Sequence, residues 1–117
     1  IGDGCIINAQ EITQSVIGIR SRIGKGSVVR RVVMMGMDMY ENYDDVLSQK
    51  IIPMGIGENC HIENAILDIN CRIGNNVVVR GGTNLEDIET ETYSVVDGII
   101  VLKKSVVIPA GSRIGDV

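Results

Sequence analysis

Aromatic side chains are nearly absent from this chain of 117 residues. It has no Phe, no Trp and three Tyr, although hydrophobic residues make up 44% of the sequence. Globular cores commonly use aromatic rings to fill volume, so we expect a narrow interior built from Ile, Val and small residues. The 14 Gly, against two Pro, predict frequent turns.

Several classes of protein are excluded by what the sequence has little of. A single His rules out a zinc centre with three His ligands. No apolar run approaches the roughly 18 residues that cross a bilayer, so no membrane partner is expected. The formal net charge of −4 argues against a nucleic-acid partner. The chain begins at Ile1 without Met or a signal-like segment, which predicts a piece of a longer protein.

Aliphatic residues return every six positions, whereas a helix would repeat them at three and four and a half-buried strand at two. The runs are Ile1 and Ile7; Ile17, Ile23 and Val29; Ile56 and Ile62; Leu67, Ile73 and Val79; and Val96, Leu102, Ile108 and Ile114. Four residues after almost every one stands a small or branched residue, namely Cys5, Ser21, Ser27, Val33, Cys60, Ile66, Cys71, Val77, Ile100, Val106 and Ser112. The tetrapeptide SRIG occurs at 21–24 and 112–115, and CRIG occurs at 71–74.

This double repeat predicts a parallel β-helix, an all-β fold in which short strands and tight turns form stacked coils. Three strands would complete one coil of about 18 residues, and coils stack at roughly 4.8 Å. About four coils fit, which gives a prism roughly 20 Å tall. The alternative is an antiparallel sandwich with coincidental spacing. Known proteins with this hexapeptide repeat are left-handed triangular prisms, so the resemblance implies left-handedness here.

Two stretches interrupt the repeat within what we interpret as a single domain over 1–117. Residues 36–55 carry Tyr40, Tyr43, Leu47 and Ile51 at helical spacing, which predicts a short amphipathic helix on the flank of the prism. Residues 80–95 are acidic and rich in turn formers, which predicts a loop. All three Tyr fall in these insertions, in agreement with an interior too tight for rings.

The single-residue candidates for chemistry have plain structural interpretations. His61 precedes an inward Ile62 and is expected at an exposed turn, with no recognisable partner for a role as general base. The three Cys occupy the small inward position, where a thiol acts as a small hydrophobe. Basic residues are more suggestive: Arg20, Arg22, Lys25, Arg30 and Arg31 fall within twelve residues, and Lys103 and Lys104 stand near the end of the chain. Such groups either solvate the outer face or align in stacked coils as an anion site.

Three segments carry a resemblance to a known family. The segments VVMMGMDMYEN (32–42), IPMGIGENCHIENAILDINCRIGNNVVV (52–79) and DGIIVLKKSVVIPAG (97–111) resemble the C-terminal domain of the glucose-1-phosphate adenylyltransferases (ADP-glucose pyrophosphorylases), more in the plant and algal wording than in the enteric one. The resemblance covers essentially the whole chain, including both insertions.

The resemblance implies a role in making ADP-glucose and pyrophosphate from ATP and glucose 1-phosphate, for starch or glycogen synthesis. The chemistry and its Mg2+ would belong to an N-terminal nucleotidyltransferase domain that is missing from this chain. The C-terminal prism would help to assemble heterotetramers of large and small subunits, activated by 3-phosphoglycerate and inhibited by phosphate. It implies a plastid location, or a cytoplasmic one if the source is bacterial.

Residue by residue, Lys104 matches the family's activator-binding lysine, whereas Lys103 falls where the family tends to be aliphatic. Ile69 replaces a second regulatory lysine, as in some large subunits, so the resemblance favours a large, regulatory subunit. Arg72 matches the Arg of the family's RIG motif and is the second expected effector-binding residue. No catalytic or metal-binding residue is expected in this segment. Two alternatives stay open: a non-catalytic β-helix interaction module of a nucleotidyltransferase-like subunit, and a hexapeptide acyltransferase, which rests on the scaffold alone.

Overall fold

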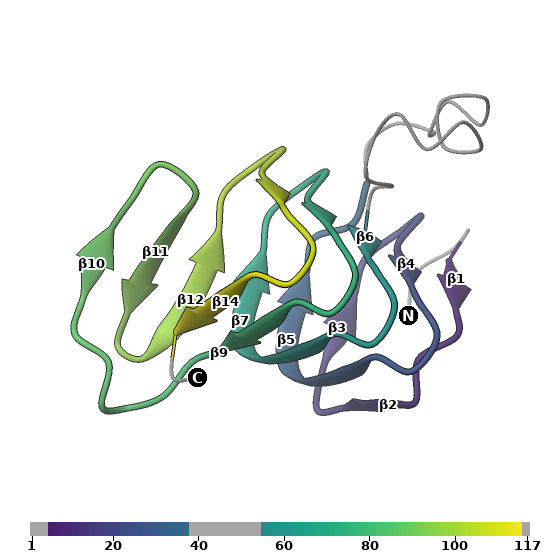
Figure 1. Cartoon of the computed structure of the whole chain (residues 1–117), viewed down its shortest axis with the longest axis horizontal. Coiled ribbons are helices and arrows are strands. Elements are labelled where there is room, and N and C mark those ends of the chain that lie inside the picture. The colour runs from purple at the N-terminus through teal and green to yellow at the C-terminus, as the bar shows by residue number, and fades with distance from the viewer. Residues whose placement is uncertain (1–4, 38–54, 116–117) are drawn as a thin grey trace.

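The computed structural model describes residues 5–37 and 55–115, and these residues form stacked coils of short strands (Figure 1). The strands are β1 (Ile6–Ile7), β2 (Glu11–Thr13), β3 (Val16–Ile17), β4 (Arg22–Ile23), β5 (Val28–Met34), β6 (Gly55–Ile56), β7 (His61–Leu67), β8 (Arg72–Ile73), β9 (Val78–Arg80), β10 (Ile88–Glu89), β11 (Tyr93–Val96), β12 (Ile99–Leu102), β13 (Val107–Ile108) and β14 (Arg113–Gly115). No helix occurs in the described residues, and the predicted parallel β-helix is confirmed.

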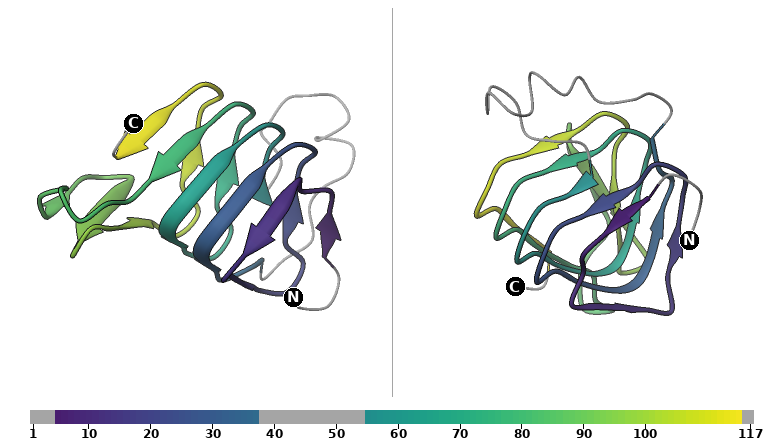
Figure 2. Two further views of the ribbon diagram at one scale, coloured as in Figure 1. Left: turned by 90° about the horizontal axis from the view of Figure 1, so that it is seen from below. Right: turned by 90° about the vertical axis from the view of Figure 1, so that its right-hand side faces the viewer.

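Three walls enclose one interior, as the view along the stack shows (Figure 2, right). Wall one contains β1, β4, β6, β8 and β13, in that order and all parallel. Wall two contains β2, the first halves of β5 and β7, then β9 and β14. Wall three contains β3, the second halves of β5 and β7, and β12. Five strands in one wall span four spacings, roughly 19 Å, which agrees with the predicted height.

The large inward residues stack in one column per wall. The columns are Ile7, Ile23, Ile56, Ile73 and Ile108 on wall one; Ile12, Val29, Ile62, Val79 and Ile114 on wall two; and Ile17, Met34, Leu67 and Leu102 on wall three. Most of these side chains are fully buried. Each aliphatic side chain therefore packs on its counterpart in the coils above and below, without the need for aromatic rings.

The small inward positions also satisfy backbone carbonyls inside the corners. The Ser27 hydroxyl donates to the Gly57 carbonyl at 2.6 Å. The Cys60 thiol lies 3.1 Å from the Gly74 carbonyl, and the Cys71 thiol lies 3.1 Å from that of Asp68. Burial is the main cause that raises the pKa of the Cys71 thiol to about 12. Ser and Cys thus fill the small inward position, as expected. They also donate hydrogen bonds to backbone carbonyls there.

The repeat is 17 residues per coil rather than the predicted 18, because one side of the triangle is shorter. Ile62 and Val79, which face each other in neighbouring coils, are 17 residues apart. The chain turns from wall two to wall three through a single residue of positive φ, Arg31 in β5 and Asn64 in β7, without leaving the strand. Leu67 therefore follows Ile62 after five positions.

Because this side is shorter by one residue, the residues predicted to point inward on wall three are wrong by one position. Val33 and Ile66 were expected inside, but Val33 is 39% exposed and their places are taken by Val32 and Ala65, both buried. In the hairpin, where Val96 was expected inside, the antiparallel pairing of β11 with β12 instead places Val95 opposite the buried Ile100 and leaves Val96 51% exposed. A slip of one residue reverses the face of every side chain in a strand.

Close stacking of the corners explains the glycine that follows the large residue of wall one. A Cβ built on Gly24 would lie 2.6 Å from the backbone carbonyl carbon of Gly57 in the next coil, and one built on Gly57 would lie 2.7 Å from the carbonyl oxygen of Gly74. These distances leave no room for a side chain, so only glycine fits at this place in each coil.

The two insertions have different outcomes. The helix predicted within 36–55 falls almost wholly on residues 38–54, which lie outside the described residues. The loop predicted over 80–95 is wrong, because β10 and β11 form an antiparallel hairpin that adds to β12 at the end of the sheet (Figure 1). β12 also pairs in parallel with β7, so the hairpin continues wall three beyond the last coil.

Candidate functional site: a corner that presents Lys104

The corner between wall three and wall one is built from four stacked turns. They are Gly18–Arg20, Met35–Met37, Asp68–Asn70 and Lys103–Ser105, which together we term the Lys104 corner. Backbone hydrogen bonds join each turn to the next: Met37 N donates to Ile19 O at 3.0 Å, Asn70 N to Gly36 O at 3.1 Å, and Ser105 N to Ile69 O at 2.9 Å. The positive φ of Arg20, Asn70 and Ser105 bends the chain at this edge.

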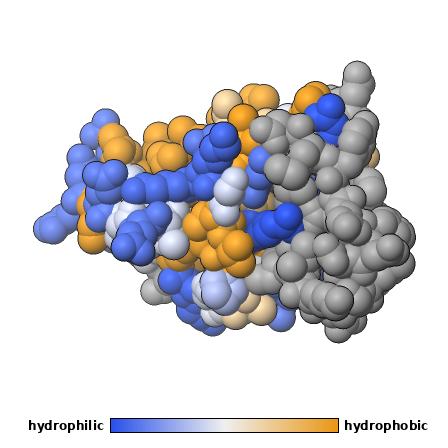
Figure 3. All heavy atoms as spheres, turned by 90° about the horizontal axis from the view of Figure 1, so that it is seen from above, coloured by the Kyte–Doolittle hydropathy of each residue, from blue (hydrophilic) through white to orange (hydrophobic). Residues whose placement is uncertain are grey.

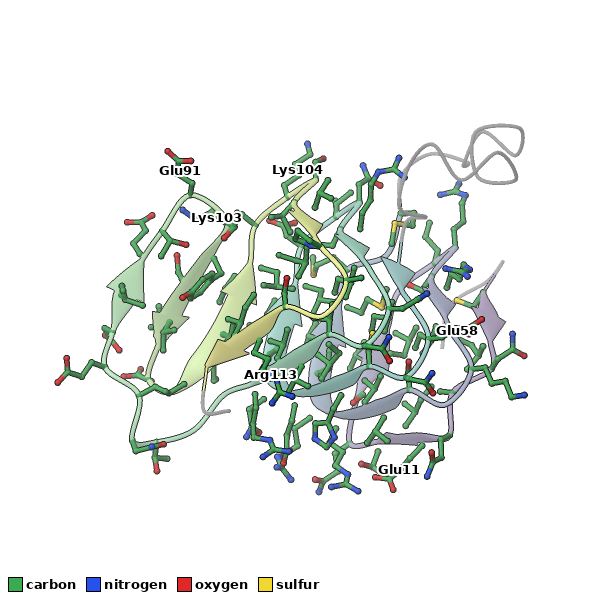
Figure 4. All side chains as sticks on the ribbon, in the orientation of Figure 1. Glu11, Glu58, Glu91, Lys103, Lys104 and Arg113 are labelled. Carbon is green, nitrogen blue, oxygen red and sulfur yellow. The ribbon has the colours of Figure 1, made fainter. Side chains whose placement is uncertain are left out.

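Lys104 lies directly over Ile69 in this stack. The link is the hydrogen bond between the backbone of Ser105 and the carbonyl of Ile69. The structure therefore brings together the two positions at which the sequence resemblance implied regulatory lysines. The Lys104 side chain is exposed and points away from the coils (Figure 4). Among residues 5–37 and 55–115, no carboxylate forms an ion pair with it.

Lys103, the neighbouring lysine, is engaged with the hairpin. Its ammonium group donates to the Thr90 carbonyl and lies 3.4 Å from Glu89 Oε1, while its backbone N–H donates to Thr92 O at 3.0 Å. Its side chain is 35% exposed. Within the part of the chain that the structure describes, Lys104 has no such partner, so the two adjacent lysines differ in how far their charge is compensated.

Arg72, the second expected effector-binding residue, lies on wall one and not in the Lys104 corner itself. It follows Asn70 by two residues, its backbone N–H donates to Val106 O at 2.8 Å, and it is half-buried with interaction partners of its own. Lys104 and Arg72 thus belong to neighbouring coils, one at the corner and the other on the adjoining wall.

The basic run over 20–31 does not form one cluster. Arg20 lies in the Lys104 corner, where its Nη1 donates to Met37 O at 2.9 Å. Arg22 belongs to wall one, Arg30 to wall two, and Arg31 to the corner that follows wall two. Residues close in sequence are carried around the prism, whereas residues 17 apart are brought together.

Figure 3 looks down on the side of the molecule that is uppermost in Figure 1. Apolar side chains reach the surface there between polar ones over the described coils. Ile19, at the first level of the Lys104 corner, is 47% exposed, and Met35 is 51% exposed. The Lys104 corner therefore has a cationic side chain, Lys104, at one end of the stack and exposed apolar side chains, Ile19 and Met35, at the other.

A polar network on wall two was not predicted. His61 was expected at an exposed turn without a partner, but it begins strand β7, is half-buried, and its Nε2 lies 3.0 Å from Glu63 Oε2. The Arg31 guanidinium donates to Glu63 Oε1. The hydrogen bond from His61, supported by the positive charges of Arg31 and Arg80, lowers the pKa of the Glu63 carboxyl group. The signal in the sequence was the spacing of two between His61 and Glu63, which places both on one face of a strand.

The described residues give two further findings on function classes. Within 5–37 and 55–115, no group of three or more His, Cys, Asp or Glu is placed to hold a metal ion. In the same residues, no helix is long and apolar enough to cross a membrane.

Comparison with known proteins identifies the family of β-helix domains to which the chain belongs. The family described as the GLGC left-handed parallel beta-helix domain matches residues 1–112. The chain therefore belongs to this family, and its left-handedness follows from that membership.

The chain is also similar in sequence to a subunit of a named enzyme. The chain is 40% identical over 119 residues to the chloroplastic/amyloplastic small subunit of glucose-1-phosphate adenylyltransferase from wheat, Triticum aestivum. The match takes in 97% of this chain but 25% of the relative. The chain thus spans about a quarter of the length of the curated relative it matches.

Proposed function

We propose that this chain is the C-terminal regulatory and assembly domain of a glucose-1-phosphate adenylyltransferase. The whole enzyme would form ADP-glucose and pyrophosphate from ATP and glucose 1-phosphate, with Mg2+ bound in a preceding nucleotidyltransferase domain. The family match over residues 1–112 and the identity to the wheat subunit support this assignment. The chloroplastic/amyloplastic name of that relative supports a plastid location.

The observation that carries the regulatory part of the proposal is the exposed Lys104 ammonium at the end of the stacked corner. A lysine without a carboxylate partner can form a charge-assisted hydrogen bond to a phosphate oxygen. An effector such as 3-phosphoglycerate, or inorganic phosphate, would then bind with Lys104 and with Arg72 on the adjoining wall. Coupling between such an effector and catalysis is typically about 1–3 kcal/mol.

Our proposal for the subunit type rests on the same corner. Ile69 lies beneath Lys104 and offers no second ammonium group at the place where the family has a lysine. This arrangement favours a large, regulatory subunit that works with small subunits in a heterotetramer. The outer walls of the prism would supply the surfaces for assembly.

Replacement of Lys104 in the full-length heterotetramer tests the proposal. Lys104→Ala is expected to raise the 3-phosphoglycerate concentration for half-activation about tenfold, because one charge-assisted contact is removed. Lys103→Ala is the matched control, since Lys103 contacts the hairpin, and it should leave the activation curve nearly unchanged. An activation curve for Lys104→Ala that superimposes on that of the unaltered enzyme would rule out the role of Lys104.

The apolar Ile69 also favours a second function, that of an interaction module without effector binding. Calorimetric titration of the assembled protein with 3-phosphoglycerate separates the two. Heat of binding that disappears in Lys104→Ala supports regulation through this domain, whereas the absence of any heat supports an interaction module alone.

A further inference from the structure

We propose that the outer face of wall two carries a second oxyanion-binding site, formed by Arg80 and Arg113. The site would take inorganic phosphate or a phosphate monoester. It is separate from Lys104, which lies at the upper edge of the molecule in Figure 4, whereas Arg113 lies in the lower half.

The first step concerns the Glu63 carboxylate, each oxygen of which already accepts a hydrogen bond from another residue. A carboxylate only accepts hydrogen bonds, so the His61 Nε2 that lies 3.0 Å from Glu63 Oε2 carries the proton. Arg31 donates to the other oxygen, Oε1. Arg80 Nε approaches Glu63 no closer than 3.6 Å, which is an attraction between charges and not a hydrogen bond.

The second step concerns Arg80 itself, whose donors lack acceptors. Its Nε is buried and has no hydrogen-bond partner among the described residues. Its Nη2 lies 3.5 Å from His61 Nε2, but that nitrogen already donates its proton to Glu63 and cannot accept another. The Arg80 side chain is nevertheless 43% exposed, so its outer N–H groups can reach an oxyanion, and the guanidinium fork matches two phosphate oxygens.

The third step is the position of Arg113. Strand β14 pairs with β9, so that Arg113 faces Val78 and Gly115 faces Arg80. From the strand spacing and the rise per residue, the Cα atoms of Arg80 and Arg113 lie roughly 8 Å apart on the same outer face. Arg113 is exposed, and within residues 5–37 and 55–115 no carboxylate pairs with it. Two long side chains at this separation can converge on one tetrahedral oxyanion.

Gly115 lies opposite Arg80 on β14. Its φ is +95°, and a Cβ at this position would lie 2.1 Å from the Arg80 carbonyl oxygen and 2.4 Å from Ile100 Cδ1. The position next to Arg80 on β14 therefore accepts only glycine. Arg30, in strand β5 of the same wall, differs from Arg80 and Arg113. Glu11 accepts hydrogen bonds from its guanidinium group through both carboxylate oxygens, so the positive charge of Arg30 is already compensated.

Protection of individual arginines from phenylglyoxal in the full-length assembled protein tests this site. Peptide mapping by mass spectrometry gives the modification rate of each arginine as inorganic phosphate is added, with KCl of equal ionic strength as the reference. At a phosphate concentration about four times the dissociation constant, the rates of Arg80 and Arg113 should fall together about fivefold. Arg30 should react at an unchanged rate.

Variants then assign the protection to this pair. In Arg113→Gln, about tenfold more phosphate should be needed to protect Arg80, because one cationic donor is lost. Arg113→Lys keeps the positive charge but loses the forked geometry of the guanidinium group. The phosphate concentration that protects Arg80 should then lie between the values for the unaltered protein and for Arg113→Gln. Lys104→Ala should leave the protection of Arg80 intact even if it abolishes activation by 3-phosphoglycerate, so failure of this site and failure of the Lys104 proposal are distinguishable.

Four results would overturn the proposal. Protection by KCl as strong as by phosphate would mean ionic screening alone, and equal protection of Arg30 would mean a diffuse basic surface. Loss of the protection in Lys104→Ala would mean that the effect originates at the Lys104 corner. Arginines that are blocked before phosphate is added would mean that another protein surface, rather than an oxyanion, covers this face.

Discussion

The coil interior and the β10–β11 hairpin are held in place by different means. In the coils each inward side chain packs between counterparts on both sides, and Ile62 and Leu67 are completely buried. In the hairpin, β10 pairs on one side only, and its Ile88 is 51% exposed. Stability in the coils therefore comes from apolar burial. In the hairpin, Val95 of β11 is buried, but the outer strand β10 depends mainly on backbone hydrogen bonds and on the contacts of Lys103.

The two regions also differ in charge. Glu86, Asp87, Glu89, Glu91 and Asp97 all lie exposed in or beside the hairpin. No Lys or Arg occurs between Arg80 and Lys103. The negative charge of the hairpin is therefore balanced mainly by basic residues outside this segment. The hairpin therefore presents an acidic surface, whereas the basic residues of both candidate sites lie on the coils.

The largest contrast is expected from removing aliphatic volume in each region. Ile62→Ala should lower the free energy of unfolding by about 3–4 kcal/mol, because it opens a cavity in a fully buried column. Ile88→Ala removes the same atoms from a half-exposed site and should cost less than about 0.5 kcal/mol. Urea denaturation of the full-length protein measures both. Equal losses for the two variants would show that the hairpin packs as tightly as the coils.

The coil architecture could be predicted from sequence because the physical requirement recurs. Every level needs an aliphatic residue on each wall and a small residue two positions before it, so the pattern is repeated along the chain. The side between Val29 and Met34 was mispredicted because it turns within a continuous strand, at a residue of positive φ, and so takes five residues instead of six. Non-glycine residues such as Arg31 give little warning of such a bend.

The sites were predictable to a smaller extent. Lys104 was identified through a family resemblance, and the structure adds its position over Ile69 and the lack of an ion pair with any carboxylate in 5–37 and 55–115. The proximity of Arg80 and Arg113 could not be read from the sequence, because the two are 33 positions apart and come to neighbouring strands only through the register of β9 and β14. The hairpin inserted between these strands breaks the 17-residue spacing that relates neighbouring coils elsewhere.

A smaller effect is expected from the thiol inside the coils. Burial raises the pKa of Cys71 to about 12, from a value near 9 in the unfolded chain, so the unfolded state loses its proton first as the pH rises. The stabilisation due to the protonated thiol is complete below pH 9 and is lost as the pH approaches 12, at up to about 1.4 kcal/mol per pH unit. Between pH 8 and pH 10 the stability of the full-length protein should fall more steeply than that of Cys71→Ala. Parallel pH profiles for the two proteins would contradict the proposed burial of this thiol.

The smallest effect tests what holds the hairpin. Lys103→Met removes the contacts of the ammonium group with Glu89 and with the Thr90 carbonyl but keeps the length of the side chain. An exposed pair of this kind contributes about 0.5 kcal/mol, so amide exchange over residues 88–93 should quicken about twofold, while exchange in β7 stays unchanged. Lys104→Met is the matched control, since Lys104 pairs with no carboxylate among the described residues, and it should leave both regions unaltered. If both variants quickened hairpin exchange equally, local charge rather than the Lys103 contacts would hold the hairpin against the last coil.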